Sequence, residues 1–325
     1  MRASHGVLTL TIGLSLALEV PVATVQAQPL AQGQAVTMVV PMAPGGGVDA
    51  IGRLMAEKLQ ERLKQSVVVE NRTGAGGIVG TDSVARSAPD GRTLLLIESS
   101  ATISRWLNKG VPFDVTRDFV PIARLATSPL VLYAHSSVEA NDVKELIELA
   151  KTNDLSAATP GFGSPHHLAH LMLNIGAEIA ITDIPYRGTG AGLADFLPGR
   201  VPLMWATPVA LSASVEAGKV KALGVASAQR AAALQQVPTI AENAVPGFNV
   251  EIWFGVAAPA KMPLEIVARY AKEIEAILKR ADVKQRLDKL GFELAFADST
   301  QFREVIADDD ARYGAAIKAA GIVPK

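Results

Sequence analysis

The residues best suited to binding chemistry form a glycine-rich segment that follows a short apolar run. Residues 41–49 read Pro-Met-Ala-Pro-Gly-Gly-Gly-Val-Asp. Because glycine lets a backbone approach a ligand closely, the N–H groups of residues 43–47 can donate hydrogen bonds to a carboxylate without any arginine. A tight turn in which Asp49 caps the following helix explains the same residues equally well. The segment alone therefore leaves a ligand site and a structural turn as open alternatives.

A second glycine-rich segment is similar to the fingerprint of dinucleotide-binding enzymes. Residues 74–80 read Gly-Ala-Gly-Gly-Ile-Val-Gly. They follow a predicted strand and open a predicted helix, and Glu98 stands after the next strand, where an acid could bind a ribose. The spacing fails, however, because the third glycine of the G-x-G-x-x-G pattern falls on Val79. An NAD-linked enzyme is therefore a weaker alternative.

Three histidines, His166, His167 and His170, lie within five residues of each other. His166 and His170 are one helical turn apart, which suits a shared metal ion in an exported metal-binding receptor. No HExxH pattern is present, and no acidic residue nearby in the sequence completes a ligand set. The simpler interpretation makes Ser164 the N-cap and Pro165 the first residue of a helix whose first turns contain the histidines.

The elements that position these residues alternate between strands and helices. Apolar runs at 36–40, 66–70 and 93–97 predict strands, and helical spacing of apolar residues at 51–63 and 79–88 predicts helices between them. Strands that alternate with helices predict a parallel sheet covered on both faces. In such a sheet, each loop after a strand opens into a crevice and meets the positive end of the next helix, where anions bind.

The same alternation continues later in the chain and predicts a second lobe. Strands are expected at 130–133 and 182–186, each followed by a helical pattern, and further helices at 264–279 and 300–320. Connections near Ser128 and Glu251 are the candidate crossings between the lobes. We therefore predict one lobe from residues 28–127 plus 251–325 and another from residues 128–250, each a mostly parallel sheet flanked by helices.

Composition limits the function classes further. The 325 residues contain 31 Lys and Arg against 32 Asp and Glu, without a long run of either sign, so no nucleic-acid surface is indicated. The absence of cysteine excludes disulfides, thiolate nucleophiles and Cys-based metal sites. No G-x-S-x-G pattern supports a hydrolase. Partners should be recognised at a local site.

The N-terminus reads as a secretory signal. Arg2 precedes an apolar stretch at about 6–18, and Val-Gln-Ala at 25–27 suits a cleavage site. The stretch is shorter than the roughly 20 residues that span a bilayer. We therefore expect removal of residues 1–27 and, in a Gram-negative cell, a periplasmic protein.

Together these segments resemble the periplasmic receptors of tripartite tricarboxylate transporters, the Bug or TctC-like family. The resemblance runs from about residue 36 to the C-terminus. Its carriers are VVPMAPGGGVDAIGRLMAEKL at 39–59, VVVENRTGAGGIVGTDSVARSAPDGRTLLL at 67–96, PFDVTRDFVPIARLA at 112–126, GFGSPHHLAHL at 161–171, IPYRGTGAGLADFLPGRV at 184–201, VPTIAE at 237–242 and PGFNVEIWFGVAAPA at 246–260.

The resemblance implies a Venus-flytrap fold that closes two α/β lobes around a small carboxylate for a membrane permease. Di- and tricarboxylates, acidic amino acids and aromatic acids are the implied ligands. No enzymatic step or cofactor is implied, and we expect a monomer. The implied ligand-binding residues are Met42, Ala43, Pro44, Gly45, Gly46, Gly47, Asp49, Ser99, Ser100, Thr102, Gly163, Ser164, His167, Arg187 and Gly188.

Some positions depart from the pattern of the family. His166 replaces a residue that is commonly small or an amide, and Glu98 precedes the serines where a small residue is usual. Thr189 and Gly190 alter a glycine-alanine step, and Pro202 stands where Asp is frequent. These departures bear on the identity of the ligand. Glu98 or Asp49 could favour a ligand that carries an amine, but a solvated strand end explains Glu98 equally well.

The signal segment gives a first prediction. Secretion should remove residues 1–27, so that the mature chain begins at Gln28. Intact-mass measurement and N-terminal sequencing of periplasmic protein check this outcome. A periplasmic protein that retains Met1 would contradict it.

Overall fold

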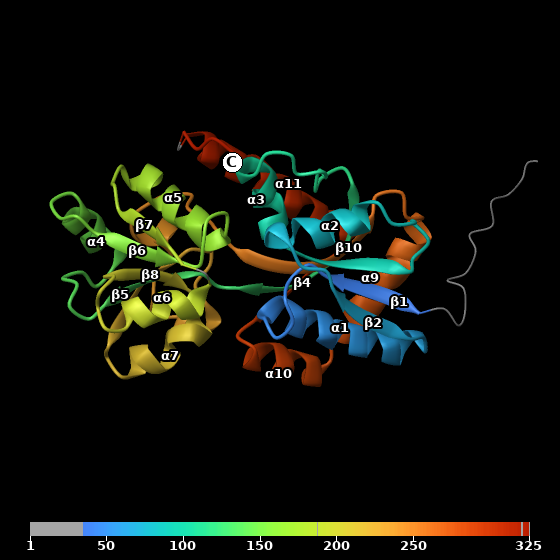
Figure 1. Cartoon of the computed structure of the whole chain (residues 1–325). Coiled ribbons are helices and arrows are strands. Elements are labelled where there is room, and N and C mark those ends of the chain that lie inside the picture. Colours follow the sequence, from blue (N-terminus) through green and yellow to red (C-terminus); the bar gives the residue numbers. More distant parts are fainter. Residues whose placement is uncertain (1–34, 187, 320, 325) are drawn as a thin grey trace, which may run out of the picture.

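The computed structural model describes residues 35–186, 188–319 and 321–324. Figure 1 shows two lobes side by side, each with one β-sheet between helices, and long strands that pass from one lobe to the other. The secretory signal expected at residues 1–27 lies outside the described residues and stays a prediction.

The first lobe contains a six-stranded sheet with the order β11-β4-β10-β3-β1-β2. Its strands are β1 (Val36–Val40), β2 (Val67–Asn71), β3 (Thr93–Glu98), β4 (Phe119–Ser128), β10 (Ile252–Pro259) and β11 (Glu293–Ala297). Its helical elements are α1 (Gly47–Leu63), the 3₁₀ turn η1 (Ala75–Gly77), α2 (Ile78–Ala85), α3 (Ser100–Leu107), α9 (Leu264–Leu278), α10 (Ala281–Lys289) and α11 (Ser299–Ala319).

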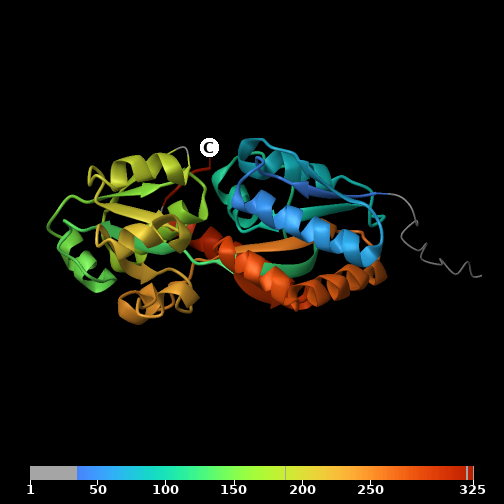
Figure 2. The ribbon, with the colours of Figure 1, turned by 90° about the horizontal axis from the view of Figure 1, so that it is seen from below.

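The helices cover both faces of this sheet, as the two views in Figures 1 and 2 show. On one face, Ile51, Leu54 and Leu59 of α1 are completely buried with Ile274 of α9. Their spacing places them on one side of a helix, as the sequence pattern requires. On the other face, α2, α3 and α11 pack on the sheet around residues such as Trp253.

The second lobe contains a five-stranded sheet with the order β7-β6-β8-β5-β9. Its strands are β5 (Val131–His135), β6 (Ser156–Thr159), β7 (Thr182–Pro185), β8 (Leu203–Ala206) and β9 (Val220–Val225). Its helical elements are α4 (Val143–Ala150), α5 (Pro165–Ala177), α6 (Thr189–Phe196), α7 (Pro208–Glu216), the 3₁₀ turn η2 (Ala232–Leu234) and α8 (Ile240–Asn243).

Both sheets are mixed, which corrects the expectation of mostly parallel sheets. Strands β1, β2 and β3 are parallel neighbours, and so are β6, β7 and β8. The remaining neighbours are antiparallel: β10 with β3 and β4, β11 with β4, and β5 with β8 and β9. For β4 and β10, the reason is that the chain leaves the first lobe along β4 and returns along β10, so these two strands run in opposite directions.

Strands β4 and β10 form the connection between the lobes. They pair along their whole length, from Ile252 opposite Ser128 to Pro259 opposite Phe119. Ser128 ends β4 just before the second lobe begins, and β10 starts just after the chain leaves that lobe. The domain boundaries at 127/128 and 250/251 themselves stay predictions.

An apolar cluster joins the lobes beside this connection. Ile103 and Leu107 of α3 and Tyr313 of α11 pack with Leu168 of α5, all almost completely buried. Helices α3 and α11 belong to the first lobe and α5 to the second. Figure 1 shows α11 above both lobes, with its end near α5. The C-terminal helix therefore helps to hold the lobes together.

Close packing explains one glycine of the dinucleotide-like segment. A Cβ atom on Gly80 would lie 2.4 Å from the carbonyl oxygen of Arg72 and 2.8 Å from the Cα of Pro41. Both obstacles are backbone atoms, which cannot rotate away. Gly80 thus lets α2 approach the end of β1, a structural task that needs no nucleotide.

We therefore predict that Gly80→Ala lowers the free energy of unfolding by about 1–3 kcal/mol, the usual range for overpacking. Gly190→Ala is the matched control, because Gly190 has an ordinary φ and no atom within 4 Å of its Cβ position. The control should leave stability unchanged or raise it by up to about 1 kcal/mol. Urea denaturation measures both, and equal effects of the two variants would contradict the packing argument.

Candidate functional site

A cavity of about 730 Å³ lies between the lobes. Its lining combines backbone at the starts of helices with large apolar side chains from both lobes. The lining residues are Met42, Gly45, Gly46, Gly47, Val48, Ala50, Glu98, Ser128, Pro160, Ser164, Pro165, His166, Gly188, Thr189, Thr207, Val209, Ile252, Phe254, Leu290 and Phe292.

Four helix starts converge on this cavity. Gly46 is the N-cap of α1 in the first lobe, and Ser164, Gly188 and Thr207 are the N-caps of α5, α6 and α7 in the second. All four residues line the cavity. No side chain caps α1, α6 or α7. The first N–H groups of these helices lack intrahelical partners and carry the positive end of the helix dipole, an arrangement that can donate hydrogen bonds to an anion.

Asp49 holds the first loop in place. Its carboxylate accepts hydrogen bonds from the amide of Gly45 at 2.9 Å, from Nε of Arg53 at 2.9 Å and from Nδ2 of Asn71 at 2.8 Å. Asn71 also donates to the carbonyl of Met42 at 3.0 Å. Although burial opposes ionisation, these hydrogen bonds and the charge of Arg53 lower the pKa of Asp49 to about 2. Asp49 is therefore engaged in the loop and absent from the cavity lining.

The end of β3 presents a different side chain from those predicted. Glu98 lines the cavity, whereas Ser99 is completely buried and Thr102 donates to the carbonyl of Ser99 at 2.7 Å. Ser100 donates to Oε1 of Glu98 and lines a small neighbouring space. Of this predicted group, Ser100 reaches the cavity only through Glu98.

In the second lobe, Ser164 and Pro165 begin helix α5 as the sequence predicted. Ser164 Oγ accepts from the amide of His167 at 3.1 Å and donates to the carbonyl of Gly161 at 2.8 Å. The hydroxyl proton of Ser164 is therefore used inside the cap. A ligand at this helix start meets mainly backbone N–H groups.

The three histidines face different partners. His166 lines the cavity, and burial lowers its pKa to about 4, so the ring is neutral at physiological pH. His167 is buried, with Nε2 3.8 Å from Oδ2 of Asp183. His170 is buried with Nε2 2.9 Å from the carbonyl of Ile181. Among the described residues, no group of three or more histidines or acidic residues could hold a metal ion.

The remaining predicted residues lie at varying distances from the cavity. Ala43, Pro44 and Gly163 do not belong to its lining. A Cβ atom on Gly163 would lie 3.5 Å from the side chain of Leu107, so this loop lies against the first lobe. Arg187 lies outside the described residues. Ligand binding by all the predicted residues stays a prediction.

Sequence reasoning missed the apolar wall of the cavity. Phe254 and Phe292 pack edge to face with ring centroids 5.0 Å apart, and Val209 joins the lining from the second lobe. These residues belong to segments far apart in the chain and follow no local motif. Thr207 was also missed, although Thr207-Pro208 is an N-cap followed by proline, a recognisable helix start.

Comparison with known proteins identifies the family to which the chain belongs. The family model described as "Tripartite tricarboxylate transporter family receptor" matches residues 51–322. The chain belongs to this receptor family. The resemblance predicted from the sequence blocks is thereby confirmed.

Solved structures similar to the receptor have the same two-lobed α/β fold. The periplasmic binding protein BugD is 33% identical, with a TM-score of 0.74 over 90% of this chain and 99% of BugD. An R. palustris protein solved with adipate is 31% identical, with a TM-score of 0.76 over 90% and 98% of the two chains. MatC from Rhodopseudomonas palustris, solved with malate, is 31% identical, with a TM-score of 0.72 over 87% and 98%. The predicted two-lobed α/β fold, with helices flanking each sheet, is confirmed.

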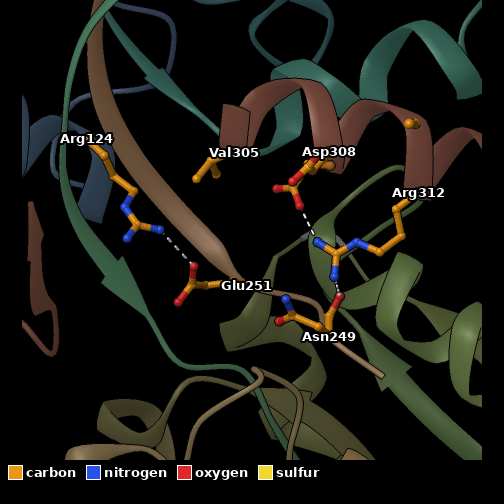
Figure 3. Close-up of a pocket in the computed structure, with 8 residues that line it drawn as sticks. Arg124, Asn249, Glu251, Val305, Asp308 and Arg312 are labelled. Carbon is orange, nitrogen blue, oxygen red and sulfur yellow. Dashed lines mark hydrogen bonds and ion pairs between the residues drawn. The ribbon is translucent and has the colours of Figure 1, made fainter. Parts of the chain in front are cut away.

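A second cavity of the receptor, of about 670 Å³, lies where the crossing strands meet α11. Figure 3 shows its charged lining. Arg124 on β4 lies 3.3 Å from the carboxylate of Glu251, and Arg312 on α11 pairs with Asp309 and donates to the carbonyl of Asn249. These arginines already have partners in the receptor, and the cavity lies beside the strands that connect the lobes. Within the described part of the chain, no helix is long and apolar enough to cross a membrane.

The hydrogen bonds of Asp49 predict that the free energy of unfolding depends on pH. Its folded-state pKa of about 2 is below the ordinary value of 3.8, so its contribution is present above about pH 4 and is lost as the pH falls towards 2. We expect Asp49→Asn to lower the free energy of unfolding by up to about 2 kcal/mol near neutral pH, and the difference from wild type to shrink at low pH. Urea denaturation at several pH values measures both changes.

Asp82→Asn serves as the control for this prediction. Asp82 pairs with Arg86 one helical turn away, but the arginine side chain is 69% exposed. Exposed pairs of this kind contribute little, so the control should change stability by less than about 1 kcal/mol. A constant difference between Asp49→Asn and wild type over the whole pH range would contradict the assignment.

Proposed function

We propose that the receptor is a periplasmic solute-binding protein that closes its lobes around a small carboxylate and delivers it to a membrane permease. The observation that carries this proposal is the convergence of four helix N-caps on one cavity: Gly46, Ser164, Gly188 and Thr207. Such helix starts donate hydrogen bonds to an anion without bringing a charged side chain into the cleft.

The chemistry of the walls adds to the proposal. Phe254, Phe292 and Ile252 supply an apolar surface beside the polar helix starts. A ligand with a carboxylate and an apolar body matches both parts. The similar structures solved with adipate and with malate support a carboxylate ligand for this receptor.

The proposal includes no chemical step. Membership of a receptor family supports a binding role, and Gly80 of the dinucleotide-like segment has a packing function. For the metal-binding alternative, His170 Nε2 already faces the carbonyl of Ile181. We further propose that the receptor is monomeric, that its signal segment is cleaved, and that its partner is the permease of a tripartite transporter.

The proposal predicts that a carboxylate stabilises the folded receptor. A panel of aliphatic, aromatic and amino-substituted carboxylates, tested by thermal shift, should contain a ligand that raises the melting temperature. A ligand at about 100 times its Kd adds roughly 2.7 kcal/mol to stability, which is readily measured. A complete absence of shifts, or binding that a chelator abolishes, would contradict the proposal.

A variant at the start of α1 tests the position of the carboxylate. Gly46 has φ −83° and ψ 172°, and a Cβ atom there would meet nothing closer than 3.8 Å. Gly46→Asp should place a capping carboxylate where the ligand carboxylate binds, and weaken affinity by about tenfold or more while the fold is kept. Gly46→Ala, the uncharged control, should lose much less affinity in calorimetry. Equal affinities of the two variants would place the ligand elsewhere.

A further inference from the structure

One carboxylate in the wall of the interlobe cavity has no described counter-charge. Glu98, the last residue of β3, is only 9% exposed and lines the cavity. Its carboxylate accepts a hydrogen bond from the hydroxyl of Ser100, which belongs to the first turn of α3. Burial raises the pKa of Glu98, and the hydrogen bond from Ser100 opposes this rise. An ionised Glu98 therefore needs a positive partner when the lobes close.

Among the described lining residues, no side chain supplies the positive charge that would pair with Glu98. His166 lines the same cavity from the second lobe, but burial lowers its pKa to about 4 and keeps the ring neutral near pH 7. The cavity lining contains no lysine or arginine among the described residues. Arg53 illustrates the difference, because it pairs with Asp49 at 2.9 Å and holds the first loop.

The cavity thus has two kinds of polar recognition. The helix starts favour a negative group, whereas Glu98 favours a positive one. Phe254 is the cross-strand partner of Glu98 in the sheet and lines the same cavity, so an apolar surface adjoins the carboxylate. A ligand that matches all three features has a carboxylate, an apolar body and an ammonium group.

We propose that Glu98 binds the ammonium group of the ligand, so that the receptor selects amino acids with an apolar linker over dicarboxylates of the same length. This inference rests on the proposed function, because it assumes that the carboxylate of the ligand occupies the helix starts. Glu98 is then the residue that determines specificity within the carboxylate class.

Matched probes test this selection by calorimetry near neutral pH. The probes are 4-aminobutanoate, 5-aminopentanoate and 6-aminohexanoate, each paired with the dicarboxylate that has the same number of carbons: succinate, glutarate and adipate. Wild type should bind the best aminoalkanoate at least about tenfold tighter than its paired dicarboxylate, the scale of a hydrogen bond to a charged group. Glu98→Gln should remove this preference to within about threefold.

A control variant keeps the test specific. Glu70→Gln removes a carboxylate that pairs with Arg72 outside the cavity, with a side chain 48% exposed, and should keep the preference of wild type.

A charge-free probe makes the test independent of how Glu98→Gln folds. 6-Acetamidohexanoate keeps the carboxylate and the linker of 6-aminohexanoate but lacks the positive charge. Wild type should bind it at least about tenfold more weakly if Glu98 binds the ammonium group.

The outcomes separate this inference from the proposed function. Tighter binding of the dicarboxylates to wild type overturns the role of Glu98 but leaves a carboxylate receptor. The same conclusion follows if the preference for aminoalkanoates survives in Glu98→Gln, or if a carboxylate binds while no aminoalkanoate does. A wild-type receptor that binds neither these probes nor any member of the broader carboxylate panel overturns the proposed function itself.

Discussion

Unpaired N–H groups at helix starts are the constraint on which the cleft depends. A helix that follows a strand must begin at the edge of the sheet, and the two lobes together place several such beginnings around one cavity. Glycine at the N-caps of α1 and α6 leaves their amides available, because no side chain competes for them. Helix α5 differs, since Ser164 already satisfies one amide. The polar part of the site is therefore made largely of backbone.

Because the polar part of the cavity is backbone, the residues that hold this backbone in position matter as much as the residues that line the cavity. Asp49 and Asn71 hold the loop before α1 through hydrogen bonds to its backbone, and Gly80 lets α2 approach the end of β1. Charged pairs such as Arg124 with Glu251 accompany the two crossing strands. None of these residues belongs to the lining of the interlobe cavity, yet Asp49 and Asn71 hold the loop before α1 and Gly80 allows the close packing of α2.

The sequence predicted the parts of the fold that follow local periodicity. Strand β1 was predicted with its observed bounds, and α9 and α11 within about one residue, because apolar residues recur at regular spacing there. Strands β6 and β8, four residues each, were missed since so short a run resembles a buried turn of helix. Strand β10 lies between β3 and β4 and is antiparallel to both. This pairing joins segments far apart in the chain, so the local sequence pattern cannot predict it.

The candidate site, like the fold, has parts that local sequence signals predict and parts that they do not. Glycine loops and the cap formed by Ser164 could be found from local signals, whereas the aromatic wall of Phe254 and Phe292 arises only when β10 and the turn before β11 meet. Asp49 was predicted beside the correct loop, but its carboxylate accepts hydrogen bonds from the amide of Gly45 and from Nε of Arg53. Spacing identifies a residue near a site, while its hydrogen-bond partners decide which way it faces.

The apolar cluster between α3, α5 and α11 has a consequence for the lifetime of the complex. Separating the lobes would expose Leu168, Ile103 and Leu107 to water, an unfavourable change whether or not a solute is present. Part of the free energy of closure thus comes from the protein, and the solute needs to supply only the remainder. If release of the proposed solute requires the lobes to separate, this contact slows its escape, because the contact must break first. Under the proposed mechanism, residence time would then depend in part on side chains that do not line the cavity, and unloading would require α5 to separate from α3.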